Sequence, residues 1–337
     1  MKKFQSNIEQ KFEIVGFLDN YVCNDINGKP IYKPTEKVLK EVPHDYILIM
    51  VQSIKTCFEL TRYLLMFKCI KTHKIQWGIE FYGDEANKIQ KMDILLDGRI
   101  KIDIKNTKII LGSEDEYFNT MDTLYNECYK YSINNNKKDI VLDIGMNIAD
   151  STLYFLKNEN IEKIYAYEPF KQTYTRALTN LGKYKTDSRL ELNCYGLSNK
   201  TEMRTLTFQE DMTCGLSTLE NMFTYVHHQY MKSKLISDTK ETFEMVHVKE
   251  AALEIAQIVQ KHKNCNFIMK MDCEGEEYNI LSNLIEKNFL MVFDFIMLEW
   301  HYKGRKSIED FLCRGGYSYH SIDKSEEMGM IYAWKQK

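Results

Sequence analysis

The sequence predicts an α/β protein built on a doubly wound, mostly parallel sheet. Residues 140–144, IVLDI, form a short apolar run that is typical of a strand buried on both faces of such a sheet. A tight turn around Gly145 follows, and residues 153–156 begin a helix. Similar apolar runs at 163–167 and 267–272 alternate with helical patterns, as expected for parallel strands joined by crossover helices.

Length and composition limit the class of protein. A chain of 337 residues is long enough for two domains. The net charge of −3 gives none of the basic footprint of nucleic-acid-binding domains, and no apolar run is long enough for a membrane span. The first residues carry two lysines but no long apolar stretch, so we expect no secretory signal. Scattered cysteines without a C-x-x-C pair indicate a reducing cytoplasm and no structural zinc.

Residues 1–85 resemble a small Rossmann-like α/β module of the kind found near nucleotide-sugar enzymes. Apolar runs at 12–20 and 45–51 predict strands, and helical spacing over 55–68 predicts a helix. The opening strand and glycine-rich loop of such modules are missing. The module therefore either binds a sugar nucleotide or partner, or acts as a packing and dimerisation platform, and the missing loop favours the platform. A homodimer is accordingly a possible state.

Residues 86–135 connect this module to the rest of the chain. Residues 99–111, RIKIDIKNTKIIL, alternate between apolar and polar side chains and predict a hairpin with Asp97-Gly98 as its turn. Apolar residues at helical spacing predict a helix over 114–132. The doubly wound sheet then occupies residues 136–337.

The turn after the first buried strand departs from a dinucleotide site. A pyrophosphate-binding turn has three glycines, whereas Asn147 and Ala149 follow a single Gly145 here. Asp143 places a carboxylate at the strand end, which would repel phosphate. That charge would suit a ligand with an ammonium and a sulfonium, such as S-adenosylmethionine (SAM). Ser151 is the expected N-cap of the helix.

An acidic residue follows the next strand. Residues 163–167 lead directly into Glu168, roughly 20 positions after the glycine turn. In this fold an acidic residue at that distance accepts hydrogen bonds from ribose hydroxyls. Glu168 is therefore the predicted ribose acceptor.

Four segments in order, VLDIGMNIADSTLYF, YAYEPF, FIMKMDCEGEEYNIL and FIMLEWH, resemble the motifs of FkbM-type SAM-dependent methyltransferases. The resemblance covers residues 139–319 and implies a class I SAM-methyltransferase fold, closed by an antiparallel hairpin of 317–321 and 330–334. Ala149 departs from the family, which usually has glycine there. The implied cofactor is SAM, and the candidate cofactor-binding residues are Asp143, Gly145, Asn147, Asp150, Ser151, Glu168, Tyr195 and Gly196.

Two strands that end at the carboxyl edge of the sheet supply the candidate catalytic residues. Residues 267–272 end in Asp272, and residues 293–300 contain Glu299 and lead into His301. Open α/β proteins bind their ligands at this edge. A histidine is suited to take a hydroxyl proton near neutral pH, so His301 is the expected base, oriented by Asp272 or Glu299.

A metal-dependent arrangement is the alternative. Asp272 and Glu299 would hold Mg²⁺ or a similar ion that lowers the pKa of the acceptor hydroxyl. This is similar to the catechol-type methyltransferases, which use a further Asn or Asp where this chain has Trp300. An octahedral ion would lack ligands, so the arrangement with His301 as base is favoured and no metal is expected.

The acceptor is expected to lie near these strand ends. Residues 205–249 are the least regular stretch, and the long insert after 214–218, rich in Tyr, Met and His, would act as a lid over the acceptor. Nothing near its His227-His228 pair completes a metal-ligand set, so a solvated or substrate-lining role is favoured. Carboxylates at a helix start can serve the helix alone, and a lysine within a strand can simply pack. The candidate substrate-binding residues are Lys270, Glu274, Glu277, Tyr225 and His228.

These observations predict a SAM-dependent O-methyltransferase acting on a sugar hydroxyl. The N-terminal module favours a nucleotide-linked hexose or heptose of surface or capsular polysaccharide biosynthesis. One alternative is a methyltransferase for a polyketide or another small-molecule acceptor. Another is an inactive SAM-binding scaffold in a polysaccharide-assembly complex.

Overall fold

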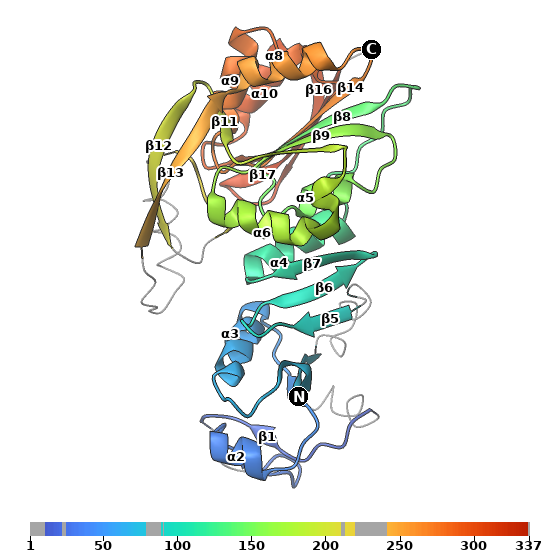
Figure 1. The fold of residues 1–337 in the computed structure, drawn as a ribbon. Coiled ribbons are helices and arrows are strands. Elements are labelled where there is room, and N and C mark those ends of the chain that lie inside the picture. Colours follow the sequence, from blue (N-terminus) through green and yellow to red (C-terminus); the bar gives the residue numbers. More distant parts are fainter. Residues whose placement is uncertain are drawn as a thin grey trace. The chain divides into compact units, whose positions relative to one another are not determined.

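The computed structural model describes residues 11–21, 25–78, 89, 91–209, 213–219 and 241–335 (Figure 1). The chain separates into two compact units, Met1–Asn126 and Glu127–Lys337. The predicted domains 1–85, 86–135 and 136–337 divide the chain more finely and stay a prediction.

The second unit contains the predicted sheet of seven strands in the order β10-β9-β8-β14-β15-β17-β16. The first five strands run parallel, whereas β17 pairs antiparallel with both β15 and β16. This arrangement confirms the doubly wound class and its terminal antiparallel hairpin. The strands are β8 (Asp139–Ile144), β9 (Ile161–Tyr167), β10 (Leu190–Asn193), β14 (Asn266–Met271), β15 (Phe295–His301), β16 (Tyr317–Asp323) and β17 (Met328–Lys335).

Helices cover both faces of this sheet. Figure 1 shows α5 and α6 on one face and α8, α9 and α10 on the other. Every residue of the central strands β8 and β14 is buried, because both faces of those strands are covered. The helices are α5 (Asp150–Phe155), α6 (Lys171–Leu181), α8 (Ala251–Lys261), α9 (Glu277–Glu286) and α10 (Lys306–Arg314).

A separate sheet of three strands stands beside the main one. It is formed by β11 (Gly196–Ser198), β12 (Glu202–Gln209) and β13 (Glu241–Glu250), with β13 in the centre. Its small core contains Phe208 and Val246 and packs against Phe170 at the start of α6. The stretch 205–249, described above as irregular, instead contains most of β12 and β13, and their long antiparallel pairing was not predicted.

The strands described in the first unit form small sheets of two or three strands. Two parallel pairs, β1-β2 and β3-β4, are followed by an antiparallel sheet β5-β6-β7. Trp77 packs edge-on against Phe58 and donates a hydrogen bond to Thr61. The elements are β1 (Phe17–Leu18), β2 (Ile31–Tyr32), α2 (Glu36–Glu41), β3 (Ile47–Ile49), α3 (Ile54–Leu65), β4 (Ile75–Trp77), β5 (Lys91–Ile94), β6 (Ile100–Ile104), β7 (Thr107–Leu111) and α4 (Glu114–Thr120).

The predicted hairpin is part of a meander with two turns. The turn at Asp97-Gly98 lies between β5 and β6, as predicted. A second turn at Lys105 and Asn106 joins β6 to β7, and both residues have positive φ, as tight hairpin turns require. The predicted helix over 114–132 is shorter: α4 ends at Thr120 and is followed by one π-helical turn, Met121–Tyr125.

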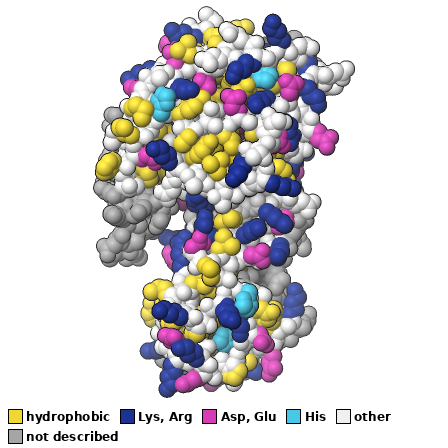
Figure 2. Space-filling model, in the orientation of Figure 1, with side chains coloured by type: hydrophobic (Ala, Val, Ile, Leu, Met, Phe, Trp, Pro, Cys, Tyr) yellow, Lys and Arg dark blue, Asp and Glu magenta, His cyan; other side chains and the backbone are white. Residues whose placement is uncertain are grey.

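Charges of both signs are interspersed over the surface shown in Figure 2. No helix among the described residues is long and apolar enough to span a bilayer. The expected absence of a nucleic-acid partner stays a prediction.

Candidate active site

The turn between β8 and α5 has a strained backbone. Gly145 has φ of +77°, and a Cβ atom there would lie 1.8 Å from the carbonyl oxygen of Asp272, so only glycine fits. Asn147 and Ala149 also have positive φ, of +48° and +74°. For Ala149 this conformation costs roughly 1–2 kcal/mol, a cost that glycine would avoid. The turn is held close to the end of β14, where Asp272 follows.

Two charged residues are buried beneath the turn. Asp143 has no exposed surface and accepts hydrogen bonds from Ser151 Oγ at 2.8 Å and Thr152 Oγ1 at 2.6 Å. Lys270 Nζ lies 3.2 Å from Asp143 Oδ1 and donates to the Gly145 carbonyl oxygen at 2.5 Å. Burial lowers the pKa of Lys270, but the nearby carboxylates, Asp143 first, raise it above its ordinary value.

The contacts of these residues bear on three expectations. The Asp143 carboxylate is directed at Ser151, Thr152 and Lys270 of its own protein. The Ser151 hydroxyl is used in that contact, and the N-cap position of α5 belongs to Ala149. The pairing of β14 with β8 places Lys270 beside Asp143. The Lys270 ammonium therefore lies beneath the Gly145 turn and contacts the carbonyl oxygen of Gly145. These residues support the turn from below.

Glu168 lies next to the turn, as predicted for a ribose acceptor. Its carboxylate accepts hydrogen bonds from the backbone N–H groups of Asn147 and Phe170, both at 3.1 Å. Only 5% of its surface is exposed, and this burial raises the pKa of Glu168 to about 8. Asp150, in the first turn of α5, is also buried.

Tyr195 and Gly196 follow β10. Gly196 begins β11 and approaches Pro169, directly after Glu168. The Tyr195 hydroxyl donates to Glu254 of α8 at 2.6 Å, so its polar end is used within the protein. The two other candidates, Tyr225 and His228, lie outside the described residues.

His301 is the centre of a cluster at the carboxyl ends of β14 and β15. Only 4% of its surface is exposed. Its Nδ1 lies 2.9 Å from Glu277 Oε1, and its Nε2 lies 3.8 Å from Asp272 Oδ1 and 3.7 Å from Glu274 Oε2. Burial opposes protonation of the imidazole, but Glu274, Glu277 and Asp272 together raise the pKa of His301 well above its ordinary value.

Glu277 is the residue that orients His301, a role that the sequence assigned to Asp272 or Glu299. It is fully buried and also accepts hydrogen bonds from the N–H groups of Cys273 and Gly275. The sequence placed Glu277 at a helix start, but not beside a histidine 24 residues away.

The remaining carboxylates have other partners. Glu274, at a positive φ of +53°, accepts from Gly215 N at 3.1 Å and from the Tyr302 hydroxyl at 3.0 Å. The Tyr129 hydroxyl donates to Asp272 at 3.3 Å. Glu299 accepts from a lysine, Lys324, at 3.1 Å. Burial, helped by the charge of Asp272, raises the pKa of Glu299 to about 7.

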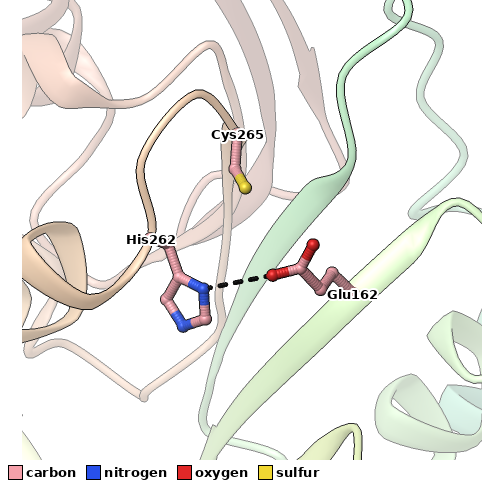
Figure 3. Close-up of side chains that lie close together, drawn as sticks. All are labelled: Glu162, His262 and Cys265. Atoms are coloured by element: carbon pink, nitrogen blue, oxygen red, sulfur yellow. Dashed lines mark ion pairs between the residues drawn. The ribbon is translucent and has the colours of Figure 1, made fainter.

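Two groups of side chains among the described residues could hold a metal ion. In each group the three ligand atoms lie within 4.8 Å of one another. One group is Asp272, Glu274 and His301 in the carboxyl-edge cluster. The other, Glu162, His262 and Cys265, lies where β9 and β14 begin, and Figure 3 shows its side chains directed at one another. Neither group was predicted, because each is assembled from distant segments.

The family model described as "Methyltransferase FkbM domain" matches residues 143–319. "Methyltransferase 1" of Beauveria bassiana (strain ARSEF 2860) is 26% identical over 162 residues, or 47% of this chain and 63% of the relative. The chain therefore spans less than two thirds of that relative's length.

Among solved structures, the methyltransferase FkbM from Methylobacillus flagellatus KT aligns with this chain at a TM-score of 0.40 and 14% sequence identity. The alignment covers 65% of this chain and 50% of the Methylobacillus chain. TrmK from M. capricolum, solved with S-adenosyl-homocysteine (SAH), has a TM-score of 0.33 and 13% identity, covering 63% and 67%.

Proposed function

Because the chain belongs to the FkbM methyltransferase family, we propose that it transfers the methyl group of SAM to a hydroxyl of a sugar. The observation that carries the proposal is one juxtaposition. The Gly145 turn with Glu168 and the cluster around His301 both lie at the carboxyl ends of neighbouring strands, β9, β8, β14 and β15. A cofactor on the turn would thus lie beside a group of acids and a histidine.

The residues of the turn fit SAM. Glu168 has the position and the charge to accept hydrogen bonds from ribose hydroxyls. Asn147 Oδ1 is buried and has no hydrogen-bond partner within the described residues, so it is suited to accept a bond from a ligand N–H or O–H group. The carboxylates of the cluster favour a cationic sulfonium nearby. SAM supplies an electrophilic methyl group on that sulfonium.

The carboxyl-edge cluster, formed by Asp272, Glu274, Glu277, Glu299 and His301, would bind and deprotonate the acceptor. Nδ1 of His301 donates to Glu277, and despite its burial the surrounding carboxylates raise the pKa of the imidazole, so His301 is poorly suited to act as a free base. Glu277 already accepts three hydrogen bonds, and Glu274 accepts two. Glu299, with Lys324 as its partner, is the better candidate to take the hydroxyl proton.

The transfer itself needs the hydroxyl oxygen about 3 Å from the methyl carbon and in line with the sulfur. As the oxygen–methyl bond forms, the sulfur–methyl bond breaks and its electron pair stays on sulfur. The hydroxyl proton passes to the Glu299 carboxylate. The products are a methyl ether and the neutral thioether of SAH.

A sugar is the proposed acceptor for two reasons. Several carboxylates near one point are suited to accept hydrogen bonds from neighbouring hydroxyls. Residues 1–85 resemble modules found near nucleotide-sugar enzymes. This resemblance favours, as the acceptor, a nucleotide-linked hexose or heptose that is used in the cytoplasm for the synthesis of surface polysaccharide. A polyketide or other small acceptor is the second candidate, and an inactive scaffold is the third.

The test is to incubate the full chain with SAM and a panel of nucleotide-linked hexoses and heptoses. We expect one acceptor to gain the mass of one methyl group while SAH forms in equal amount. A Glu299→Gln variant, which retains the size of the side chain, is the matched control. Tight SAH binding without turnover on any acceptor would favour the scaffold, and a product methylated on nitrogen or carbon would refute O-methylation.

A further inference from the structure

We propose that Asp272, Glu274 and His301 bind a divalent cation of the Mn²⁺ type at the carboxyl edge of the sheet. Their ligand atoms lie within 4.8 Å of one another, and His301 Nε2 is 3.7–3.8 Å from the two carboxylates. Ligand atoms bound about 2.1 Å from one cation lie about 3.0–3.4 Å apart. Contractions of about 0.3–0.8 Å at His301 Nε2, and of at most about 1.8 Å between the two carboxylates, would therefore complete three ligands on one side of an ion.

The surroundings of His301 also favour a ligand at this place. The side chain is almost fully buried, and Nε2 is directed into the space between the carboxylates. Distances of 3.7 and 3.8 Å are too long for hydrogen bonds, and Nε2 has no hydrogen bond within the described parts of the chain. A cation between the three groups would give Nε2 a partner at bonding distance, which the two carboxylates at 3.7 and 3.8 Å do not.

The other side of the ring is arranged as in metal-binding histidines. Nδ1 donates to the buried carboxylate of Glu277 at 2.9 Å, which fixes the ring and leaves Nε2 for the ion. Glu277 is itself fixed by the N–H groups of Cys273 and Gly275. Histidine ligands to metals almost always have such an outer partner.

The local charge also favours a cation. Four carboxylates gather here, those of Asp272, Glu274, Glu277 and Glu299. The nearby cationic groups are the imidazole, Lys324 and, toward Asp272, the Lys270 ammonium, which also pairs with Asp143. Buried charges require compensation by opposite charge. A divalent ion would balance the excess of negative charge.

Glu274 supplies a metal ligand that the sequence analysis did not include. The sequence offered Asp272 and Glu299 as ligands, with Trp300 at the place of a third. In the structure the positive φ of Glu274 turns its side chain toward His301 Nε2, and Tyr302 and Gly215 hold the carboxylate in place. Two carboxylates and an imidazole suit Mn²⁺ better than Mg²⁺, which prefers oxygen ligands alone.

The role of the ion rests on the proposed methyl transfer. A cation at the cluster would bind the acceptor hydroxyl, lower its pKa and hold its oxygen toward the methyl group. The proton would still leave to the Glu299 carboxylate. The binding of the ion does not depend on that chemistry and can be measured without turnover.

The group of Glu162, His262 and Cys265 is the competing site and provides the control (Figure 3). His262 Nδ1 lies 3.4 Å from Glu162 Oε1, and Nε2 lies 2.8 Å from the Tyr165 hydroxyl. A thiolate and an imidazole favour Zn²⁺ over Mn²⁺. Any Mn²⁺ bound must therefore be assigned between the two groups.

The experiment titrates Mn²⁺ into the metal-free full chain with SAH present and follows the free ion by electron paramagnetic resonance. We expect one site whose affinity falls at least about ten-fold in Glu274→Gln and in Asp272→Asn. The Cys265→Ser variant should bind Mn²⁺ like the wild type. SAH affinity, measured on every variant, reports whether the fold is intact.

Three results would overturn the proposal: no Mn²⁺ binding by a chain that binds SAH, binding unchanged in both folded carboxylate variants, or binding lost in Cys265→Ser. Two further results distinguish failure of the metal proposal from failure of the proposed function. Methyl transfer that survives EDTA at full rate would refute the role of the ion in the transfer and leave the proposed function standing. Mn²⁺ bound at the cluster by a chain that does not use SAM would refute the proposed function alone.

Discussion

Replacing Glu168 by glutamine should weaken the binding of SAH in a manner that depends on pH. The substitution keeps the shape of the side chain but removes its charge. Glu168 accepts two backbone hydrogen bonds from Asn147 and Phe170, which the amide can retain only in part. The ribose hydroxyls would then meet a neutral acceptor.

The magnitude follows from the contacts. A hydrogen bond to a charged group contributes about 1.5–3 kcal/mol, so Glu168→Gln should raise the Kd of SAH about 10- to 150-fold. This full effect is expected only where the wild-type carboxyl is ionised.

The sign of the pH dependence follows from the raised pKa. Burial raises the pKa of Glu168 to about 8 in the free protein, so below that pH the carboxyl is largely protonated. Binding that favours the carboxylate must release this proton, and affinity should rise with pH and level off above about pH 8. The difference between wild type and Glu168→Gln should therefore be largest at alkaline pH and smaller near about pH 6.

Titration calorimetry from about pH 6 to about pH 9, in two buffers of different ionisation enthalpy, measures both quantities. The wild type should release a proton on binding near neutral pH, and Glu168→Gln should lack this proton and the associated pH slope. Because SAH is the same in both titrations, the variant controls for ionisation of the ligand. Equal Kd values and equal proton release in the two proteins would refute the ribose assignment.

Three further substitutions test the site and its support. Gly145→Ala forces a Cβ atom against the Asp272 carbonyl at a left-handed φ and should cost about 2–4 kcal/mol in urea unfolding, whereas an unchanged midpoint would contradict the close approach. Arg204→Met leaves the buried Glu276 carboxylate without its guanidinium partner and should cost about 3–5 kcal/mol, partly recovered when Glu276→Gln is added; no recovery would argue against the pair as the cause. Glu299→Gln should lower kcat about 10²- to 10⁴-fold with SAH affinity intact, and a normal kcat would remove Glu299 as the proton acceptor.

The sheet could be predicted because its signals are local. The apolar run of β8, the glycine turn and the start of α5 follow one another in the sequence, and so do β9 and Glu168. The alternation of apolar and polar residues over β16 and β17 likewise predicts the closing hairpin.

The contacts of the site could not be predicted, because they depend on which strands are neighbours and on individual backbone angles. Lys270 pairs with Asp143 only because β14 lies beside β8 in that register. Glu277 and His301 meet because α9 begins beside the end of β15. The positive φ of Glu274 directs its carboxylate to His301, and no sequence pattern for glutamate indicates such an angle.

The most direct test of the account is a crystal structure of the full chain with SAH. We expect both ribose hydroxyls to lie at hydrogen-bond distance from the Glu168 carboxylate, about 2.5–3.0 Å, with the sulfur facing the cluster of Asp272, Glu299 and His301. SAH bound with its ribose away from Glu168, or with its sulfur directed away from that cluster, would contradict it.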